Sequence, residues 1–202
     1  MFISVDSENP EIWYLMDAVR VLQDGGVIAY PTDTVYGFGC DLFNREAIDR
    51  IYQLKRISRK KPLSFICADL THIAEFARVS NIAYRMMKRL LPGPYTFILP
   101  ATHKVPRLML TKRRTVGIRV PDNKICYELV TKLGNPIIST SVELRDDDPV
   151  SDPFKIYEEY SGKLDAVIDG GLLKADVSTI IDLSEREPVL VRQGKGDVSG
   201  IF

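Results

Sequence analysis

The sequence predicts an α/β fold. We expect one domain over residues 1–202, with helices flanking a twisted sheet of mixed parallel and antiparallel strands. Short apolar runs typical of strands alternate along the chain with segments whose apolar residues recur at helical spacing. The 202 residues are 45% hydrophobic and 27% charged, which suits a compact core and argues against global disorder.

No run approaches the ~20 apolar residues that a membrane span needs. The first ten residues lack the basic start and the apolar core of a secretory signal. We therefore expect a cytoplasmic protein with no membrane partner.

The first half of the chain begins with an edge strand and an amphipathic helix. Pro10 suits a first helical turn, Pro31 cannot donate to a sheet and ends the second strand, and Asn44 is a good N-cap. The predicted elements are a strand at 3–5, a helix at 10–24, a strand at 27–30, a helix at 44–54, a strand at 63–67, and helices at 69–77 and 81–91.

The second half is richer in strands. The rigid Pro92-Gly93-Pro94 break precedes a run of β-favouring residues, and later strands are separated by Gly- and Pro-containing turns. The predicted elements are strands at 95–99, 115–121 and 136–138, helices at 122–133 and 153–160, and strands at 165–169, 178–182 and 188–192.

Residues 31–39 gather polar side chains at the end of a predicted strand. Thr32, Asp33, Thr34 and Tyr36 supply three hydroxyls and a carboxylate, and the glycines at 37 and 39 let the backbone approach a ligand closely. Ligands of open α/β sheets bind where strands end. The same residues also fit a polar turn between two strands.

Charge is unevenly distributed although the net charge is zero. Residues 45–124 hold 18 Lys/Arg and 5 Asp/Glu, whereas residues 143–187 hold 5 Lys/Arg and 13 Asp/Glu. The asymmetry indicates a basic face for phosphates or nucleic acid, or else solvated helices of alternating sign. Five of the eight residues at 55–62 are cationic, more than the end of a helix needs, so this loop is a candidate to close on a polyphosphate.

The chemistry indicated is charge stabilisation. The chain has no Ser-His-Asp or Cys-His set, no Walker-type loop and no His-rich metal pattern, and its three scattered cysteines fit buried free thiols. What remains suits a phosphorylated ligand, with Mg²⁺ held mainly by the ligand's phosphates. These groups are hydroxyls near strand ends (Thr32, Thr34, Ser139, Ser141, Ser178), Arg119, Arg192 and the cationic loop.

The stretch Pro-Thr-Asp-Thr-Val-Tyr-Gly-Phe-Gly at 31–39 resembles the Pro-Thr-x-Thr-x-Tyr-Gly-Leu-Gly signature of the YrdC/YciO family, the threonylcarbamoyl-AMP synthases and their relatives. Further blocks follow in family order, so the resemblance covers nearly the whole chain. They are Lys55 with Lys61-Pro62-Leu63, Pro92-Gly93-Pro94-Tyr95-Thr96, Val116-Gly-Ile-Arg119-Val-Pro121, Ser139-Thr-Ser141, Ser178-Thr179-Ile-Ile-Asp182 and Val191-Arg192-Gln-Gly194.

The resemblance implies a YrdC/RibB-like sheet around a concave basic cavity. It also implies a reaction in which L-threonine, bicarbonate and ATP give threonylcarbamoyl-AMP and pyrophosphate, for the modification of tRNA adenosine, with Mg²⁺ bound through the ATP phosphates. The implied roles are as follows: catalysis by Lys55, Arg56 and Arg59; threonine binding by Thr34, Tyr36, Arg119 and Thr179; and nucleotide binding by Lys55, Arg59, Thr140, Ser141, Glu143, Ser178 and Arg192.

Three positions depart from the pattern of the synthases. Ile57 stands where they carry the Arg of Lys-x-Arg, Ile66 where we place their His, and Glu143 where Ser-x-Asn has its Asn. Glu only accepts hydrogen bonds and is negative, which is unfavourable beside phosphates unless Arg56 or Arg59 neutralises it.

The Ser-Thr-Ser-Val-Glu-Leu run and the Gly-Lys-Gly-Asp-Val-Ser ending are closer to the YciO branch. Two alternatives to a synthase therefore stay open. One is a protein that binds double-stranded RNA or tRNA with weak or no synthesis. The other is a carbamoyl-transfer enzyme with a different amine substrate.

Overall fold

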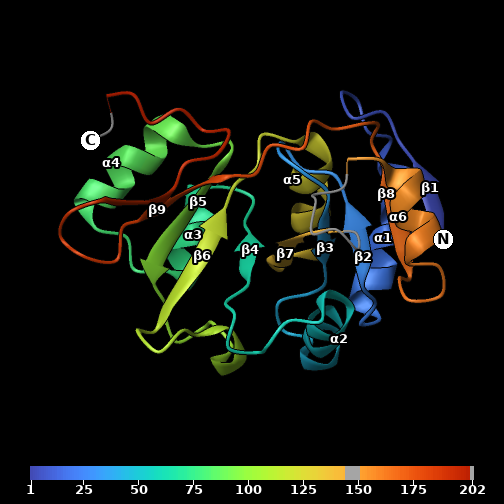
Figure 1. Ribbon diagram of the computed structural model, residues 1–202, viewed down its shortest axis with the longest axis horizontal. Coiled ribbons are helices and arrows are strands. Elements are labelled where there is room, and N and C mark those ends of the chain that lie inside the picture. Colours follow the sequence, from blue (N-terminus) through green and yellow to red (C-terminus); the bar gives the residue numbers. More distant parts are fainter. Residues whose placement is uncertain (144–150, 201–202) are drawn as a thin grey trace.

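A computed structural model describes residues 1–143 and 151–200. In these residues the strands form one mixed sheet, in the order β1-β8-β2-β3-β7-β4-β6-β5-β9-β10 (Figure 1). The strands are β1 (Phe2–Ser4), β2 (Ile28–Tyr30), β3 (Gly37–Gly39), β4 (Ser64–Ile66), β5 (Tyr95–Pro100), β6 (Thr115–Arg119), β7 (Ile137–Ser141), β8 (Ala166–Asp169), β9 (Thr179–Asp182) and β10 (Val189–Arg192).

Parallel and antiparallel pairs are both present, as predicted. Parallel pairs join β8 to β1 and β2, β4 to β6, and β5 to β9. Antiparallel pairs join β3 to β2 and β7, β4 to β7, β5 to β6, and β9 to β10.

Helices cover both faces of the sheet. None of those in the described residues has the length and apolar composition to cross a bilayer. The helices are α1 (Ile12–Gln23), α2 (Arg45–Lys55), α3 (Leu70–Phe76), α4 (Asn81–Leu90), α5 (Lys124–Leu133), α6 (Pro153–Glu159) and the 3₁₀ turn η1 (Arg107–Met109).

The core has two parts, one on each face of the sheet. Successive strand residues point to opposite faces, so Ala29 belongs to the core that includes residues of α2, α3, α4 and α6, whereas Ile28 and Tyr30 belong to the core that includes residues of α1 and α5. The N-cap predicted for α2 is confirmed, because the Asn44 side chain accepts a hydrogen bond from the Ala47 backbone N–H.

Two segments differ from the sequence prediction. Gly37–Gly39, which was not among the predicted elements, is a strand paired with β2. Residues 31–36 are therefore a turn between two strands, which confirms the alternative left open above. The strand predicted at 136–138 continues through Ser141, because its backbone pairs with β3 on one side and β4 on the other. Small polar residues have weak strand propensity, and pairing on both edges overrides it here.

Gly39 is required by packing within the sheet. A Cβ at this position would lie 2.5 Å from Cε1 of Tyr30 and 2.8 Å from Cγ2 of Ile137, whereas at Gly37 the nearest atoms are 3.5 Å away. Both glycines are buried in the same short strand. The close approach predicted for Gly39 is therefore to the Tyr30 ring.

The different surroundings of Gly37 and Gly39 allow a matched test of the packing within the sheet. We expect Gly39→Ala to lower the free energy of unfolding by about 1–3 kcal/mol, because the buried ring and Ile137 have to move. Gly37→Ala should be neutral or stabilising by about 0.5 kcal/mol, because alanine restricts the unfolded chain more than glycine does. Urea denaturation of both variants measures the difference, and equal losses would contradict this account of Gly39.

Candidate functional site

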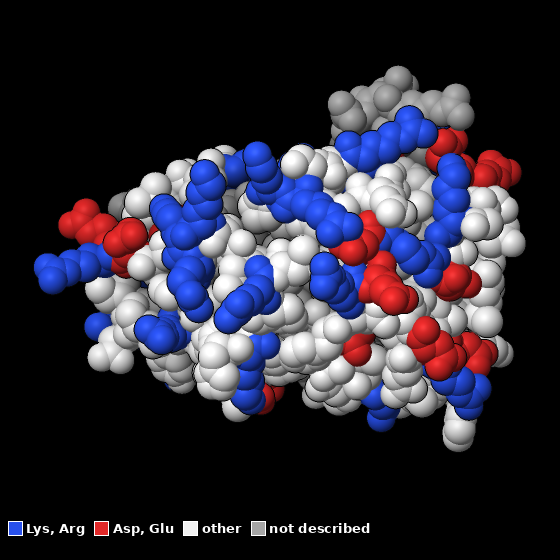
Figure 2. Space-filling model, turned by 90° about the horizontal axis from the view of Figure 1, so that it is seen from below, with Lys and Arg blue, Asp and Glu red and all other residues white. Residues whose placement is uncertain are grey.

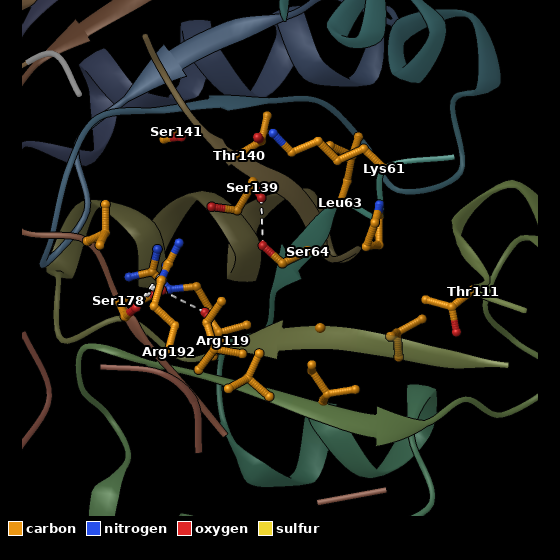
Figure 3. A pocket seen from close by; sticks show the side chains of 18 of the residues that line it. Lys61, Leu63, Ser64, Thr111, Arg119, Ser139, Thr140, Ser141, Ser178 and Arg192 are labelled. Carbon is orange, nitrogen blue, oxygen red and sulfur yellow. Dashed lines mark hydrogen bonds between the residues drawn. The ribbon is translucent and has the colours of Figure 1, made fainter. Parts of the chain in front are cut away.

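A cavity of about 670 Å³ opens beside the sheet (Figure 3). Its walls come from strands β4, β5, β6, β7, β9 and β10, from the turn after β2 and from the loop after α2. Most of the predicted site residues line it: Thr34, Lys55, Arg119, Thr140, Ser141, Glu143, Ser178 and Arg192.

A buried ion pair fixes one end of the cavity. Nη2 of Arg119 on β6 lies 2.7 Å from Oδ1 of Asp33, and the two side chains are only 7% and 8% exposed. The same Nη2 donates to Oγ1 of Thr34 at 3.0 Å, and the other Asp33 carboxylate oxygen accepts from the Asp122 backbone N–H. The turn at 32–34 is therefore held against β6.

Arg119 keeps one donor unused. Its Nε is buried and has no hydrogen-bond partner in the described part of the chain, although the side chain lines the cavity. A buried N–H without a partner is costly, and an acceptor entering the cavity would satisfy it.

Arg192 lies next to Arg119 in the cavity wall (Figure 3). Its Nε and Nη2 donate to the Ser178 carbonyl at 3.1 and 2.8 Å, and the Ser178 hydroxyl lies 2.8 Å from that of Thr96. Burial and the repulsion from Arg119 lower the pKa of Arg192. Two guanidinium groups facing one space favour an anion between them.

A register shift in the pairing of β9 with β10, between Leu190 and Arg192, precedes the arginine contact. Such bulges commonly redirect a side chain near a site. All four residues of β10 are exposed.

The opposite wall carries a second ion pair. Nζ of Lys55, whose side chain is 3% exposed, lies 3.0 Å from Oε1 of Glu143 and donates to the Ser141 carbonyl at 2.5 Å. The Ser141 hydroxyl donates to the same Glu143 oxygen at 2.7 Å. Burial raises the pKa of Glu143, but the hydrogen bonds from Ser141 and Lys55 outweigh it and the net shift is downward, so this carboxyl is ionised at neutral pH.

The group that neutralises Glu143 is therefore Lys55, and the expectation that Arg56 or Arg59 would do so is wrong. Arg59 pairs with Asp49 at 2.9 Å and lines no part of the cavity. Arg56 ends α2 and lies outside the cavity lining. Sequence proximity to Lys55 does not bring these arginines into the cavity, because the chain turns at the end of α2.

Tyr36 and Thr179 also lie outside the cavity lining. The buried Tyr36 hydroxyl donates to the Gly171 carbonyl and accepts from the Gly170 N–H. Oγ1 of Thr179, which is fully buried, donates to the Gly196 carbonyl and accepts from the Gly194 N–H. Both side chains hold backbone segments in place.

The three departures from the synthase pattern fall in different environments. Ile57 lines the cavity and gives it an apolar wall where the pattern has a cation. Ile66 is fully buried in the core with α1 and α5, so it places no side chain in the cavity. Glu143 lines the cavity as an ionised group.

Sequence reasoning missed several lining residues. Thr96 is the last residue of the segment at 92–96 that resembles the family pattern, so the resemblance could have indicated it. Arg113 lines the cavity, pairs with Asp182 at 2.5 Å and donates to Ser184. The sequence indicated it only through the excess of Lys and Arg in residues 45–124.

The charge of the cavity is partly neutralised from within. Its lining names six Lys or Arg and two Asp or Glu. Three of the six cations form ion pairs: Lys55 with Glu143, Arg113 with Asp182 and Arg119 with Asp33. Lys61, Lys112 and Arg192 form no ion pair with a described residue, so these three are available to a ligand.

The described residues offer neither an exposed cysteine nor a preformed cage of metal ligands. Cys40, Cys67 and Cys126 are buried free thiols, as predicted, and burial raises the pKa of each. Residues 1–143 and 151–200 contain no group of three or more His, Cys, Asp or Glu side chains placed to hold a metal ion.

Comparisons with known proteins agree with this fold. An uncharacterized protein of Haemophilus influenzae is 42% identical over 201 residues, which are 98% of this chain and 97% of that protein. Escherichia coli YciO is 39% identical over 199 residues, with the same coverage. The crystal structure of E. coli YciO superposes with a TM-score of 0.93 and covers 98% of this chain and 97% of that one.

A more distant relative has a named activity. The threonylcarbamoyl-AMP synthase of Pyrococcus abyssi is 32% identical over 195 residues, which are 93% of this chain and 56% of that protein. The crystal structure of P. abyssi Sua5 complexed with L-threonine superposes with a TM-score of 0.93 at 31% identity, over 100% of this chain and 59% of that one. A family model for Sua5, YciO and YrdC, described as "Telomere recombination", matches residues 20–194. This chain therefore belongs to the Sua5/YciO/YrdC family.

Proposed function

We propose that the protein is a threonylcarbamoyl-AMP synthase-like nucleotidyltransferase of the cytoplasm. It uses L-threonine, bicarbonate and ATP, releases pyrophosphate, and supplies an intermediate for tRNA threonylcarbamoyladenosine. The observation that carries the proposal is the pair of guanidinium groups of Arg119 and Arg192, which face one cavity beside the Ser178 and Thr34 hydroxyls, with Nε of Arg119 left without a partner.

This end of the cavity suits two neighbouring anions. The carboxylate of threonine would accept from Arg119 and lie near Thr34, and the α-phosphate of ATP would accept from Arg192 and the Ser178 hydroxyl. Thr140 and Ser141 would meet the nucleotide from the opposite wall. Mg²⁺ would enter with the ATP phosphates, as is usual where the protein supplies no cage of its own.

The chemistry needs positioning and charge stabilisation. Bicarbonate and the amine of threonine give a carbamate with loss of water. A carbamate oxygen then attacks the α-phosphorus, the bond to the bridging oxygen breaks, and pyrophosphate leaves with the electron pair. Cations and hydroxyls held rigidly around the phosphorus stabilise the charge that develops on its oxygens. Lys61 and Arg192, which carry no ion pair among the described residues, are best placed for this.

A second candidate function is binding of tRNA or double-stranded RNA with weak or no synthesis. The observation that favours it is the Lys55–Glu143 ion pair. Lys55 was expected to meet the triphosphate, and the ion pair neutralises its charge. In addition, Lys and Arg side chains gather over much of one face of the molecule (Figure 2).

Pyrophosphate release from ATP separates the two functions. With bicarbonate present we expect release that depends on L-threonine, and a parallel scan of other amino acids tests whether a different amine is the substrate. No release with any amino acid, together with RNA binding whose log affinity falls linearly with log salt, would replace the synthase by the RNA-binding function.

Arg192→Ala tests the phosphate position. We expect the Kd for ATP to rise about 10- to 100-fold, because a hydrogen bond to a charged group contributes about 1.5–3 kcal/mol. The melting temperature should change little, since the side chain lies on an exposed strand. Arg186→Ala removes an exposed arginine that lines no part of the cavity and serves as the control. Equal ATP affinity in the two variants would remove Arg192 from the site.

Glu143→Asn tests the charge in the opposite wall. The asparagine amide oxygen can still accept a hydrogen bond from Lys55, but the substitution removes a negative charge near the phosphates. We expect ATP to bind about tenfold more tightly, which corresponds to roughly 1.4 kcal/mol. Glu143→Gln keeps the length of the side chain and should give the same direction. An unchanged Kd in both variants would place the phosphates away from Glu143.

A further inference from the structure

A second hollow lies on the other side of Lys55 and Glu143. It has a volume of about 1230 Å³ and lies between the C-terminal end of α2 and α6, and we call it the α2–α6 groove. Lys55, Ile57, Lys61 and Glu143 line both the groove and the cavity described above, so the two spaces share a wall.

The groove carries more cations than acids. Its lining includes Arg50, Lys55, Arg56, Lys61 and Lys163 against Glu143 and Glu159. Lys and Arg side chains also dominate the left and centre of the molecular face in Figure 2.

Not all of these cations are available to a ligand. Arg50 pairs with Asp165 at 2.9 Å, and Lys55 pairs with Glu143. The Lys163 ammonium lies 5.8 Å above the Tyr160 ring, a contact that leaves its donors open. Arg56 and Lys61 are exposed and form no ion pair or side-chain hydrogen bond with any described residue. An anion in the groove would therefore meet Arg56, Lys61 and Lys163.

The backbone at Arg56 gives an independent reason to look here. This residue ends α2 in the left-handed conformation, with φ 51° and ψ 35°. The conformation is unfavourable for a residue with a side chain, and glycine is the usual residue at such helix ends. The Arg56 side chain forms no hydrogen bond or ion pair with a described residue, and its charge acts on the nearby Tyr160 hydroxyl. Residues held in such conformations cluster at ligand sites, and Arg56, unlike Arg114, also lines the groove.

We propose that the α2–α6 groove is a second anion-binding site, which takes a short phosphate chain through Arg56, Lys61 and Lys163. This assignment of the ligand rests on the proposed function, under which the phosphate chain is inorganic pyrophosphate that is leaving the cavity. Because Lys61 lines both spaces, a pyrophosphate moving from one to the other stays in contact with a cation.

The structure offers a matched pair of variants for the test. Arg56→Gly removes the cation and places glycine where it is favoured, so the fold should be kept or stabilised. Arg114→Gly makes the same change at the other described non-glycine residue with positive φ, 56°, and this residue lines neither space. The two variants lose the same charge and relieve the same backbone conformation.

Titration calorimetry with inorganic pyrophosphate measures the effect. We expect Arg56→Gly to raise the Kd about tenfold, as for loss of one charged contact, and Arg114→Gly to bind like the unmodified protein. Equal affinities in Arg56→Gly and Arg114→Gly would overturn the groove site. A loss confined to Arg192→Ala would place pyrophosphate in the cavity and overturn it as well.

Titration with AMP keeps the two proposals apart. AMP should bind the unmodified protein and Arg56→Gly equally and Arg192→Ala weakly. Failure of AMP and ATP to bind the unmodified protein would count against the synthase and leave the pyrophosphate result standing.

A double-stranded RNA probe distinguishes the source of the phosphates. If Arg56→Gly weakens RNA binding more than Arg114→Gly does, with pyrophosphate unaffected, the groove takes a nucleic-acid backbone and the proposal is wrong.

Discussion

The buried ion pair between Arg119 and Asp33 is the constraint on which the cavity depends. Asp33 comes from the turn between β2 and β3, and Arg119 comes from β6, three strands beyond β3 in the order of the sheet. The pair joins two parts of the sheet that are connected in strand order through β7 and β4, and it contacts Thr34 through the same guanidinium. A buried ion pair adds little net stability, because desolvation offsets the attraction. Its value here is geometric, since it fixes one wall of the cavity relative to the other.

Ion pairs within the described residues neutralise three of the six cations that line the cavity. Lys55 and Arg113 are held by Glu143 and Asp182, so a polyanion does not meet the full positive charge of the lining. The cations left open are Lys61, Lys112 and Arg192, at separate points around the cavity wall. Such an arrangement favours a ligand whose negative groups match these positions over any anion of sufficient charge.

The sequence predicted the order of the elements well and the site in part. Helical periodicity, caps and apolar runs are local signals, and they located α2, β5 and β6 within a few residues. The strand at Gly37–Gly39 was missed because its stability comes from neighbours on both edges. In the site, Thr34, Arg119 and Ser178 were found because they stand in family segments. The partner of Glu143 was assigned wrongly, since Lys55 and Glu143 are 88 residues apart in the numbering and only the pairing of β7 brings them together. Arg56 and Arg59 were expected in the cavity because they are neighbours of Lys55 in the loop that the family resemblance assigns to the triphosphate.

The shift of register between β9 and β10 affects more than the direction of Arg192. An outermost strand with unpaired N–H and C=O groups is a template on which another chain can add, and the exposed valines at 189 and 191 would favour such growth. A bulge interrupts the regular spacing that an incoming strand needs, and it lies within the strand that carries the cavity arginine. Straightening β10 would thus turn the arginine from its place and at the same time expose a continuous edge prone to self-association. In this strand, protection of the edge and the position of the Arg192 side chain depend on the same irregularity.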